Sequence, residues 1–270
     1  MVKIILSDID GTFLRHDKSV PELHASAVRE IISRGIKFAL VSARMPEAIY
    51  PITDGINLPR IPVISYSGAL VLTETEKILH DKKMPADDTA KILAEMNRWQ
   101  DIAVNFYTGR KWYVRANDRQ NRYVEYEVKV TQAPVETADF EKLLSGGTLP
   151  NKILVMCEPP VCEEMERELG ELFPRLNVVR SAPHLLEVMD RSVSKAVGIE
   201  ILLKHYGFTV DEAIAFGDNY NDIEMLEYIP QSVAMGNAPD RIKKIASAVT
   251  DTNENAGIYT YLKKAGVISN

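Results

Sequence analysis

The sequence predicts an α/β protein with a Rossmann-like parallel sheet as its core and an α+β domain inserted into that core. Short apolar segments alternate with amphipathic helical segments near both ends of the 270-residue chain, which is typical of strands buried on both faces of a parallel sheet. The middle of the chain lacks this alternation and is richer in hairpin-like segments. A chain of this length can hold a large α/β domain together with a smaller one.

The N-terminal segments predict the first strands of the sheet. Residues 2–7, 36–42 and 61–67 are short apolar runs that we expect to form buried strands. Between the first two, Ser19 and Glu22 have the spacing of a capping box, which indicates the start of a helix. Strand, helix and strand in this order are typical of a parallel sheet.

The remaining segments predict a return to this pattern after the insert. We expect C-terminal helices over residues 194–205, 221–229, 239–247 and 257–266, with strands over 213–218 and 231–236. In the insert we expect two strands joined at Gly109 within 104–114, a helix over 160–173, and strands over 152–158, 177–181 and 185–189. The predicted core is therefore residues 1–82 and 188–270, and the predicted insert is residues 83–187.

The composition is that of a globular protein, with 46% hydrophobic and 26% charged residues. The formal net charge of −6 argues against general nucleic-acid binding, which would show as a basic patch or stripe. An acidic enzyme that handles an anionic substrate must supply positive charge locally. We therefore expect a metal ion, or a few well-placed lysines and arginines, at its site.

We expect neither a membrane protein nor a secretory protein. The first residues are a strand-like run rather than a charged leader, and no segment approaches the roughly 20 apolar residues that span a bilayer. We expect a cytoplasmic protein that does not bind membranes and is a monomer or weak dimer. In that setting Cys157 and Cys162, five residues apart, are expected to pack rather than to form a disulfide.

The strongest functional signal is the segment Asp8-Ile9-Asp10-Gly11-Thr12, directly after the first predicted strand. Ligands of open α/β sheets bind beyond the carboxyl ends of the strands. Two carboxylates that leave a strand two residues apart start in the same direction. Taken alone, this segment could also be an Asp-Gly turn with solvated acids.

A second acidic segment, Gly217 to Asp222, follows another predicted strand and contains Asp218, Asn219 and Asn221. One of these residues is expected to cap the following helix, because Asn and Asp favour that position. Carboxylates gathered at one sheet edge would repel one another, and some would stay protonated without a cation. Oxygen ligands with room for water suit Mg²⁺.

Two weaker signals add a hydroxyl and a cation. Lys195 lies at the start of a predicted helix, where the helix dipole favours acids instead. Ser42, Ala43 and Arg44 leave the second predicted strand, where a hydroxyl and free N–H groups could hold a phosphate oxygen. An exposed lysine and an ordinary serine are the alternative interpretations. The four segments together supply a nucleophile, a hydroxyl, a cation and metal ligands.

These four segments resemble the four motifs of the haloacid dehalogenase superfamily, in order along the chain: residues 8–12, Ser42, Lys195 and residues 217–222. The long insert resembles the large α/β cap of the Cof-type sugar-phosphatase branch. Two segments depart from the usual pattern of that branch. Residues 42–44 read Ser-Ala-Arg instead of Thr-Gly-Arg, and residues 67–69 read Ser-Gly-Ala instead of Asn-Gly-Ala.

The resemblance implies a Mg²⁺-dependent phosphatase that acts on a small phosphorylated metabolite, with a sugar phosphate as the best class. It implies that Asp8 is the nucleophile and Asp10 the acid and base, and that Asp8, the Asp10 carbonyl and Asp218 hold Mg²⁺. The implied phosphate-binding residues are Ile9, Ser42, Ala43, Lys195 and Asn221. The implied supporting residues are Thr12, Arg44, Asn219 and Asp222, the last of which is expected to orient Lys195 or metal-bound water.

The cap is expected to choose the substrate by closing over the site and excluding water. Arg110, Arg115 and His184 are candidates for contacting a polar leaving group, although residues of these types are usually solvated at a surface.

The sequence is also compatible with two other functions. A phosphomutase or phosphotransferase of the same superfamily would share Asp8 and Asp10 but return the phosphate to the sugar. A non-catalytic protein that binds phosphorylated metabolites would need neither residue, so the intact pair argues against it. A dehalogenase is disfavoured, because that chemistry calls for neither Asp10 nor the acidic cluster.

Overall fold

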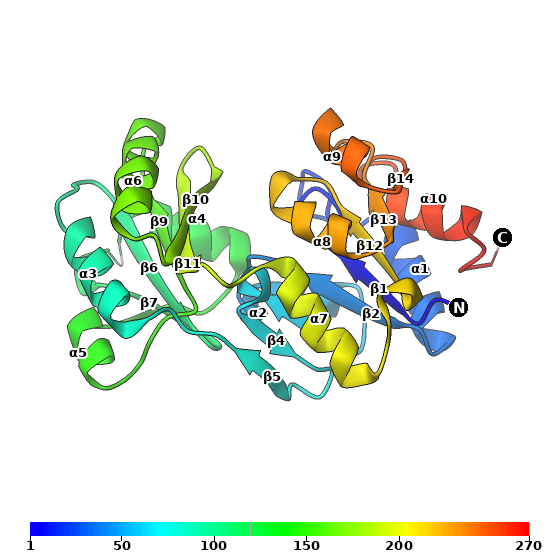
Figure 1. The fold of residues 1–270 in the computed structure, drawn as a ribbon, viewed down its shortest axis with the longest axis horizontal. Helices are drawn as coiled ribbons and strands as arrows, with labels where there is room; N and C mark the ends of the chain where they lie inside the picture. Colours follow the sequence, from blue (N-terminus) through cyan, green and yellow to red (C-terminus); the bar gives the residue numbers. More distant parts are fainter. Residues whose placement is uncertain (119, 270) are drawn as a thin grey trace. The chain divides into compact units, whose positions relative to one another are not determined.

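The computed structural model describes residues 1–118 and 120–269. The chain forms two compact units. The first unit contains Met1–Arg44, Ile49–His80 and the chain from Ser194 onward, and the second contains Met45–Ala48 and Asp81–Val193. The predicted α/β class is confirmed, with a sheet in each unit (Figure 1).

The sheet of the first unit is centred on β1 (Ile4–Ser7), which pairs in parallel with β2 (Lys37–Val41) and with β12 (Ala213–Gly217) (Figure 1). Its strand order is β14-β13-β12-β1-β2-β3-β4-β5. The outer strands are β3 (Val63–Ser65), β4 (Leu70–Leu72), β5 (Ile78–Asp81), β13 (Gln231–Ala234) and β14 (Ala248–Val249). β4 is antiparallel to β3, whereas β3, β13 and β14 continue the parallel pairing. This order brings the carboxyl ends of β1, β2 and β12 to one edge.

Helices pack on this sheet through buried apolar side chains. They are α1 (Glu22–Ser33), α2 (Pro46–Gly55), α7 (Lys195–Tyr206), α8 (Ile223–Tyr228), α9 (Asp240–Ile245) and α10 (Gly257–Lys264). Ile199 and Leu202 of α7 pack with Ile4 and Leu6 of β1 in one buried cluster. Because Ile4, Ile5 and Leu6 are all fully buried, β1 is covered on both faces, as its continuous apolar run predicts.

The sheet of the second unit has the order β10-β11-β9-β6-β7-β8 and is antiparallel apart from the β7–β8 pair. Its strands are β6 (Ala103–Thr108), β7 (Lys111–Val114), β8 (Glu136–Thr137), β9 (Lys152–Met156), β10 (Leu176–Ala182) and β11 (Leu185–Asp190). Its helices are α3 (Ala86–Met96), α4 (Arg122–Thr131), α5 (Phe140–Ser145) and α6 (Pro159–Leu172). Phe106, Ile153 and Val188 on one face of the sheet pack against Ile92 of α3 and Met165 of α6.

The structure corrects three local predictions. The expected capping box is absent: Pro21 precedes α1 without a capping side chain, and Ser19 Oγ donates to Asp17 instead. The strand expected to reach residue 67 ends at Ser65, because a 3₁₀ turn, η1 (Tyr66–Gly68), follows it. Cys157 and Cys162 are buried as expected, but they are joined in a disulfide.

The other 3₁₀ turns are η2 (Ala116–Asp118), η3 (Val210–Glu212) and η4 (Tyr220–Asp222). No helix within the described residues is long and apolar enough to span a bilayer.

Candidate active site

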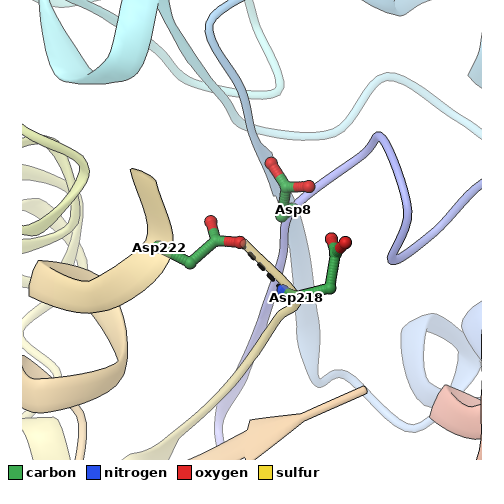
Figure 2. Close-up of side chains that lie close together, drawn as sticks. All are labelled: Asp8, Asp218 and Asp222. Atoms are coloured by element: carbon green, nitrogen blue, oxygen red, sulfur yellow. Dashed lines mark hydrogen bonds between the residues drawn. The ribbon is translucent and has the colours of Figure 1, made fainter. Parts of the chain in front are cut away.

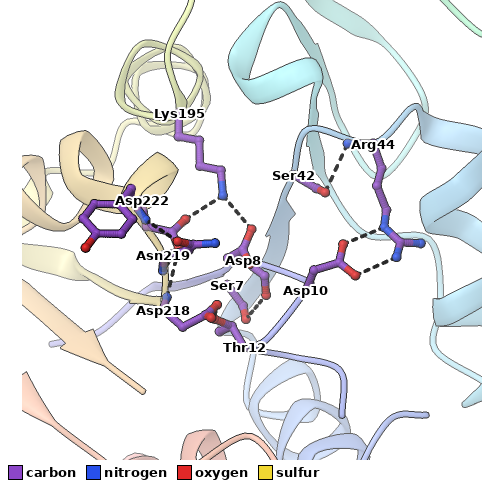
Figure 3. Close-up of polar contacts among 11 residues, drawn as sticks. Ser7, Asp8, Asp10, Thr12, Ser42, Arg44, Lys195, Asp218, Asn219 and Asp222 are labelled. Atoms are coloured by element: carbon purple, nitrogen blue, oxygen red, sulfur yellow. Dashed lines mark hydrogen bonds and ion pairs between the residues drawn. The ribbon is translucent and has the colours of Figure 1, made fainter. Parts of the chain in front are cut away.

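Asp8 is the first residue after β1 and lies at the centre of a buried polar cluster (Figure 3). Its backbone N–H continues the sheet by donating to the Phe216 carbonyl at 3.0 Å. Its side chain is almost fully buried, and Oδ1 accepts a hydrogen bond from Lys195 Nζ at 2.5 Å. The reading of this segment as a turn with solvated acids is therefore wrong for Asp8.

The loop after Asp8 turns back on itself and meets the loop after β12. The carbonyl of Ile9 accepts the backbone N–H groups of Phe13 and Leu14, which closes the turn. Gly11 has a φ of +83°, and a Cβ there would lie 2.3 Å from Asp218 Oδ2. Only glycine fits this approach. Thr12 Oγ1 then donates to Asp218 Oδ1 at 2.7 Å, so the two sequence motifs are in direct contact.

Lys195 is fully buried, so its alternative interpretation as an exposed surface lysine is excluded. Its Nζ lies 2.5 Å from Asp8 Oδ1 and 2.6 Å from Asp222 Oδ1. The start of α7 is docked closely on η1, because a Cβ on Gly68 would lie 2.1 Å from the Ser194 carbonyl oxygen. This contact, with the cap that Ser194 Oγ provides to the Val197 N–H, sets the position of Lys195.

Asp222 organises the segment after β12. Its Oδ1 accepts from Lys195, and its Oδ2 accepts the backbone N–H groups of Asp218 and Asn219 at 2.9 and 3.0 Å. Both oxygens are therefore in use, which suits an orienting role. Asn219 is a helix cap, because its Oδ1 accepts the Tyr220 N–H. Asn221 lies exposed on η4.

Asp10 is held by two cations rather than by the buried cluster. Arg44 binds it in a bidentate manner, with Nε 2.8 Å from Oδ2 and Nη2 2.7 Å from Oδ1 (Figure 3). Lys18 Nζ lies 2.9 Å from Oδ1. Ser42 is buried beside this pair, and its Oγ accepts the Arg44 N–H at 3.2 Å. Sequence reasoning missed Lys18, because nothing local links it to Asp10, and the intervening loop brings it there.

The carboxyl groups differ sharply in acidity. Burial raises the pKa of Asp8 well above its ordinary value, opposed by Lys195 and reinforced by Asp222 and Asp218. Burial also raises the pKa of Asp218 to about 6, against the lowering effect of the Thr12 hydrogen bond. Burial would raise the pKa of Asp10 as well, but the hydrogen bonds and charges of Arg44 and Lys18 outweigh it and lower the pKa to about 2.

The oxygens of Asp8, Asp218 and Asp222 fit a divalent cation (Figure 2). One carboxylate oxygen from each lies within 4.8 Å of the others. A cation between Asp8 and Asp218 would offset the burial, and the smaller repulsion from neighbouring carboxylates, that raise their pKa values. Because the oxygens of Asp222 already accept three hydrogen bonds, Asp8 and Asp218 are the better ligands. An all-oxygen set suits Mg²⁺.

The family model of the haloacid dehalogenase-like hydrolases matches residues 5–262 of the chain, in agreement with this geometry. The chain belongs to the haloacid dehalogenase-like hydrolases. It is thus an enzyme of a hydrolase family, and the family resemblance seen in the sequence is confirmed.

Similar proteins extend over the whole chain. A Haemophilus influenzae protein named "Putative phosphatase" is 33% identical over 264 residues, which cover 98% of each chain. A haloacid dehalogenase-like hydrolase from Bacteroides thetaiotaomicron is 27% identical, with a TM-score of 0.88 over 98% of this chain and 100% of that one. A HAD subclass IIB sugar phosphatase shares the fold, at 23% identity and a TM-score of 0.82, over 99% of this chain and 100% of that one.

The three cap candidates of this haloacid dehalogenase-like hydrolase occupy separate places in the second unit. Arg110, in the turn between β6 and β7, pairs with Glu47. Arg115 lies over the Phe140 ring and lines a cavity of about 750 Å³ within that unit. His184 is exposed between β10 and β11. Their roles toward a substrate stay predictions.

The structure adds one residue to the site that sequence reasoning overlooked. Asn237 follows β13, and its Nδ2 donates to the Gly11 carbonyl at 2.8 Å and approaches Asp218 Oδ2 at 3.4 Å. The rule that ligands bind beyond strand ends could have found it, because β13 is the strand next to β12.

Proposed function

We propose that this hydrolase is a Mg²⁺-dependent phosphatase that acts on a small phosphorylated metabolite through a phosphorylated Asp8. The observation that carries the proposal is the contact of Asp8 with the buried Lys195, beside Asp218. A carboxylate held by a buried cation at a strand end has the position of a nucleophile that must approach an anion. The family membership and the phosphatase name of a full-length relative support the same activity.

The proposed reaction has two displacements at phosphorus. In the first, an Asp8 oxygen forms a bond to phosphorus, the bond to the leaving oxygen breaks, and Asp10 gives that oxygen its proton. In the second, Asp10 takes a proton from water, whose oxygen attacks phosphorus and releases Asp8 and inorganic phosphate. Because Arg44 and Lys18 stabilise the carboxylate form of Asp10, Asp10 must leave this pairing to carry the proton of the first step.

Charge on the transferring group would be held by neighbouring donors. Lys195, Ser42 and Asn221 are the proposed side-chain donors to the phosphoryl oxygens, with the backbone of Ile9 and Ala43 beside them. Asp222 keeps Lys195 in place, as its hydrogen bond at 2.6 Å supports. Asp8, Asp218 and the Asp10 carbonyl would hold Mg²⁺. When bound, this ion supplies positive charge that lets the Asp8 carboxylate approach a phosphate.

A sugar phosphate is the proposed substrate class. A solved structure with the same fold is that of a sugar phosphatase, and the inserted second unit is proposed to select the leaving group. In this proposal residues 1–82 and 188–270 carry the chemistry and residues 83–187 carry the specificity.

Hydrolysis of p-nitrophenyl phosphate by the purified protein, with and without Mg²⁺, tests the activity. We expect Mg²⁺-dependent phosphate release that the Asp8→Asn substitution abolishes, since the amide is a poor nucleophile. Full activity of Asp8→Asn would overturn the role of Asp8. A panel of sugar phosphates then separates hydrolysis from transfer. Formation of an isomeric sugar phosphate without free phosphate would indicate a mutase. Binding of the sugar phosphate without turnover would indicate a non-catalytic protein.

A further inference from the structure

Asn237 joins the two loops that carry the proposed metal ligands. Its single amide group donates to the Gly11 carbonyl at 2.8 Å and approaches Asp218 Oδ2 at 3.4 Å. Gly11 belongs to the loop after β1, next to Asp10, and Asp218 follows β12. One side chain, from a third strand end, therefore bridges both loops.

The orientation of this amide is determined by its third partner. Asn237 Oδ1 accepts the backbone N–H of Asn253 at 3.0 Å, so the Nδ2 end must face Gly11 and Asp218. The turn that carries Asn237 is anchored as well, since Met235 N–H donates to the Gly217 carbonyl and Gly236 N–H donates to the Asp251 carbonyl, both at 3.0 Å. Asn237 is thus a fixed donor although it is exposed to solvent.

Asn253 holds the far end of the same loop. It is fully buried, and its Nδ2 donates to the Leu14 carbonyl at 2.8 Å. The loop from Gly11 to Leu14 is therefore tied at both ends by two asparagines that contact each other. Thr12, in the middle of this loop, binds Asp218 Oδ1 at 2.7 Å.

We infer that Asn237, held in place by Asn253, is a positioning residue that sets the affinity of the site for Mg²⁺. The two oxygens of Asp218 each face one donor, Thr12 on Oδ1 and Asn237 on Oδ2, which fixes the plane of the carboxylate. The hydrogen bond to the Gly11 carbonyl holds the Gly11–Thr12 peptide, which directly follows the Asp10 carbonyl, a proposed ligand. Without the Asn237 amide, both ligands must be ordered when the ion binds, and that ordering weakens binding.

This inference rests on the proposed function only through the Mg²⁺ site, so it is tested by metal binding rather than by turnover. Titration calorimetry of Mg²⁺ into the metal-free full-length protein compares wild type with Asn237→Ala. Loss of a residue that orients metal ligands commonly lowers metal affinity about 10- to 100-fold, and we expect a weakening in that range. The Mg²⁺ activation constant for p-nitrophenyl phosphate should shift with it, while the substrate KM at saturating Mg²⁺ stays unchanged.

Asn255→Ala is the matched control. Asn255 lies near Asn253 and donates from its amide to the Asp251 side chain at 3.1 Å, whereas the Gly236 N–H that anchors the Asn237 turn bonds to the Asp251 backbone carbonyl. Its substitution should leave Mg²⁺ affinity unchanged, and all three proteins should unfold at similar temperatures without metal. Equal Mg²⁺ affinity of wild type and Asn237→Ala would overturn the inference and leave the proposed function intact. Absence of Mg²⁺ binding in the wild type would overturn both.

Discussion

Asp222 accepts a hydrogen bond from Lys195 at 2.6 Å although neither side chain reaches solvent. Asp8 shares the same ammonium group, so one buried cation serves two carboxylates. The attraction of Asp222 and Asp8 outweighs burial and raises the pKa of Lys195 above its ordinary value, which keeps it charged. The pair therefore contributes to the fold and to the site together.

Asp222→Ala should lower both stability and activity. Removing one partner of a buried ion pair commonly costs about 3–5 kcal/mol, because the other charge loses its compensation. The N–H groups of Asp218 and Asn219 lose their acceptor as well. Urea unfolding measures the first effect and p-nitrophenyl phosphate hydrolysis the second. The control is Glu136→Ala, which breaks an exposed ion pair with Lys111. If Asp222→Ala lowered the free energy of unfolding as little as Glu136→Ala does, the buried ion pair would be contradicted.

His24 should make the protein less stable in mild acid. It is fully buried between the Phe13 carbonyl, which lies 3.1 Å from Nδ1, and the Ile258 N–H, which donates to Nε2 at 3.2 Å. Burial lowers its pKa from 6.5 to about 4. Between these values the unfolded chain binds more protons than the folded one, so stability is lost as the pH falls below 6.5.

This effect amounts to about 2 kcal/mol between pH 7 and pH 5. His24→Gln keeps a donor and an acceptor but does not titrate, so its unfolding free energy should change less over this interval than that of the wild type. His205→Gln, at an exposed position, serves as the control. The same pH dependence in the wild type and in His24→Gln would show that another group is responsible.

Gly68→Ala should displace the start of α7 and reduce activity. Gly68 has a φ of +109°, and a Cβ there would lie 2.1 Å from the Ser194 carbonyl, next to Lys195. Gly207 also has a positive φ, of +69°, but no described atom lies within 4 Å of a Cβ there. Gly207→Ala should cost only the backbone strain of about 1–2 kcal/mol and keep full kcat. Equal kcat in the two variants would argue against the docking of α7 as the feature that places Lys195.

Mg²⁺ binding should weaken as the pH falls through 6. A carboxyl group must lose its proton to bind a metal ion, and burial holds the pKa of Asp218 at about 6. Protons therefore compete with Mg²⁺ for Asp218 below that value. Calorimetry at pH 7.5 and pH 5.5 should show an affinity about fourfold lower at the more acidic pH, from Asp218 alone. Identical affinities at the two values would exclude Asp218 as a titrating ligand, and Asp218→Asn should abolish binding at both.

The sequence by itself determined the strands around the site and the residues at their ends. The apolar runs of β1 and β12 predict buried strands, and Asp8 and Asp218 are the residues directly after them. These features are local, because a short apolar run and the residue after it lie within a few positions of each other. The predicted capping box at Ser19 was wrong although its spacing was right, because the Ser19 hydroxyl donates to Asp17 instead of capping the helix.

Only the tertiary structure decided how the polar groups are paired. Lys195 could have been an ordinary surface lysine until the docking of η1 on α7 buried it beside Asp8. The bonds of Lys18 to Asp10 and of Asn237 to Gly11 likewise depend on loops folding back. A side chain offers the same donors wherever it lies in the sequence. Packing between distant segments decides which acceptor each donor meets, and the spacing of residues along the sequence does not predict that packing.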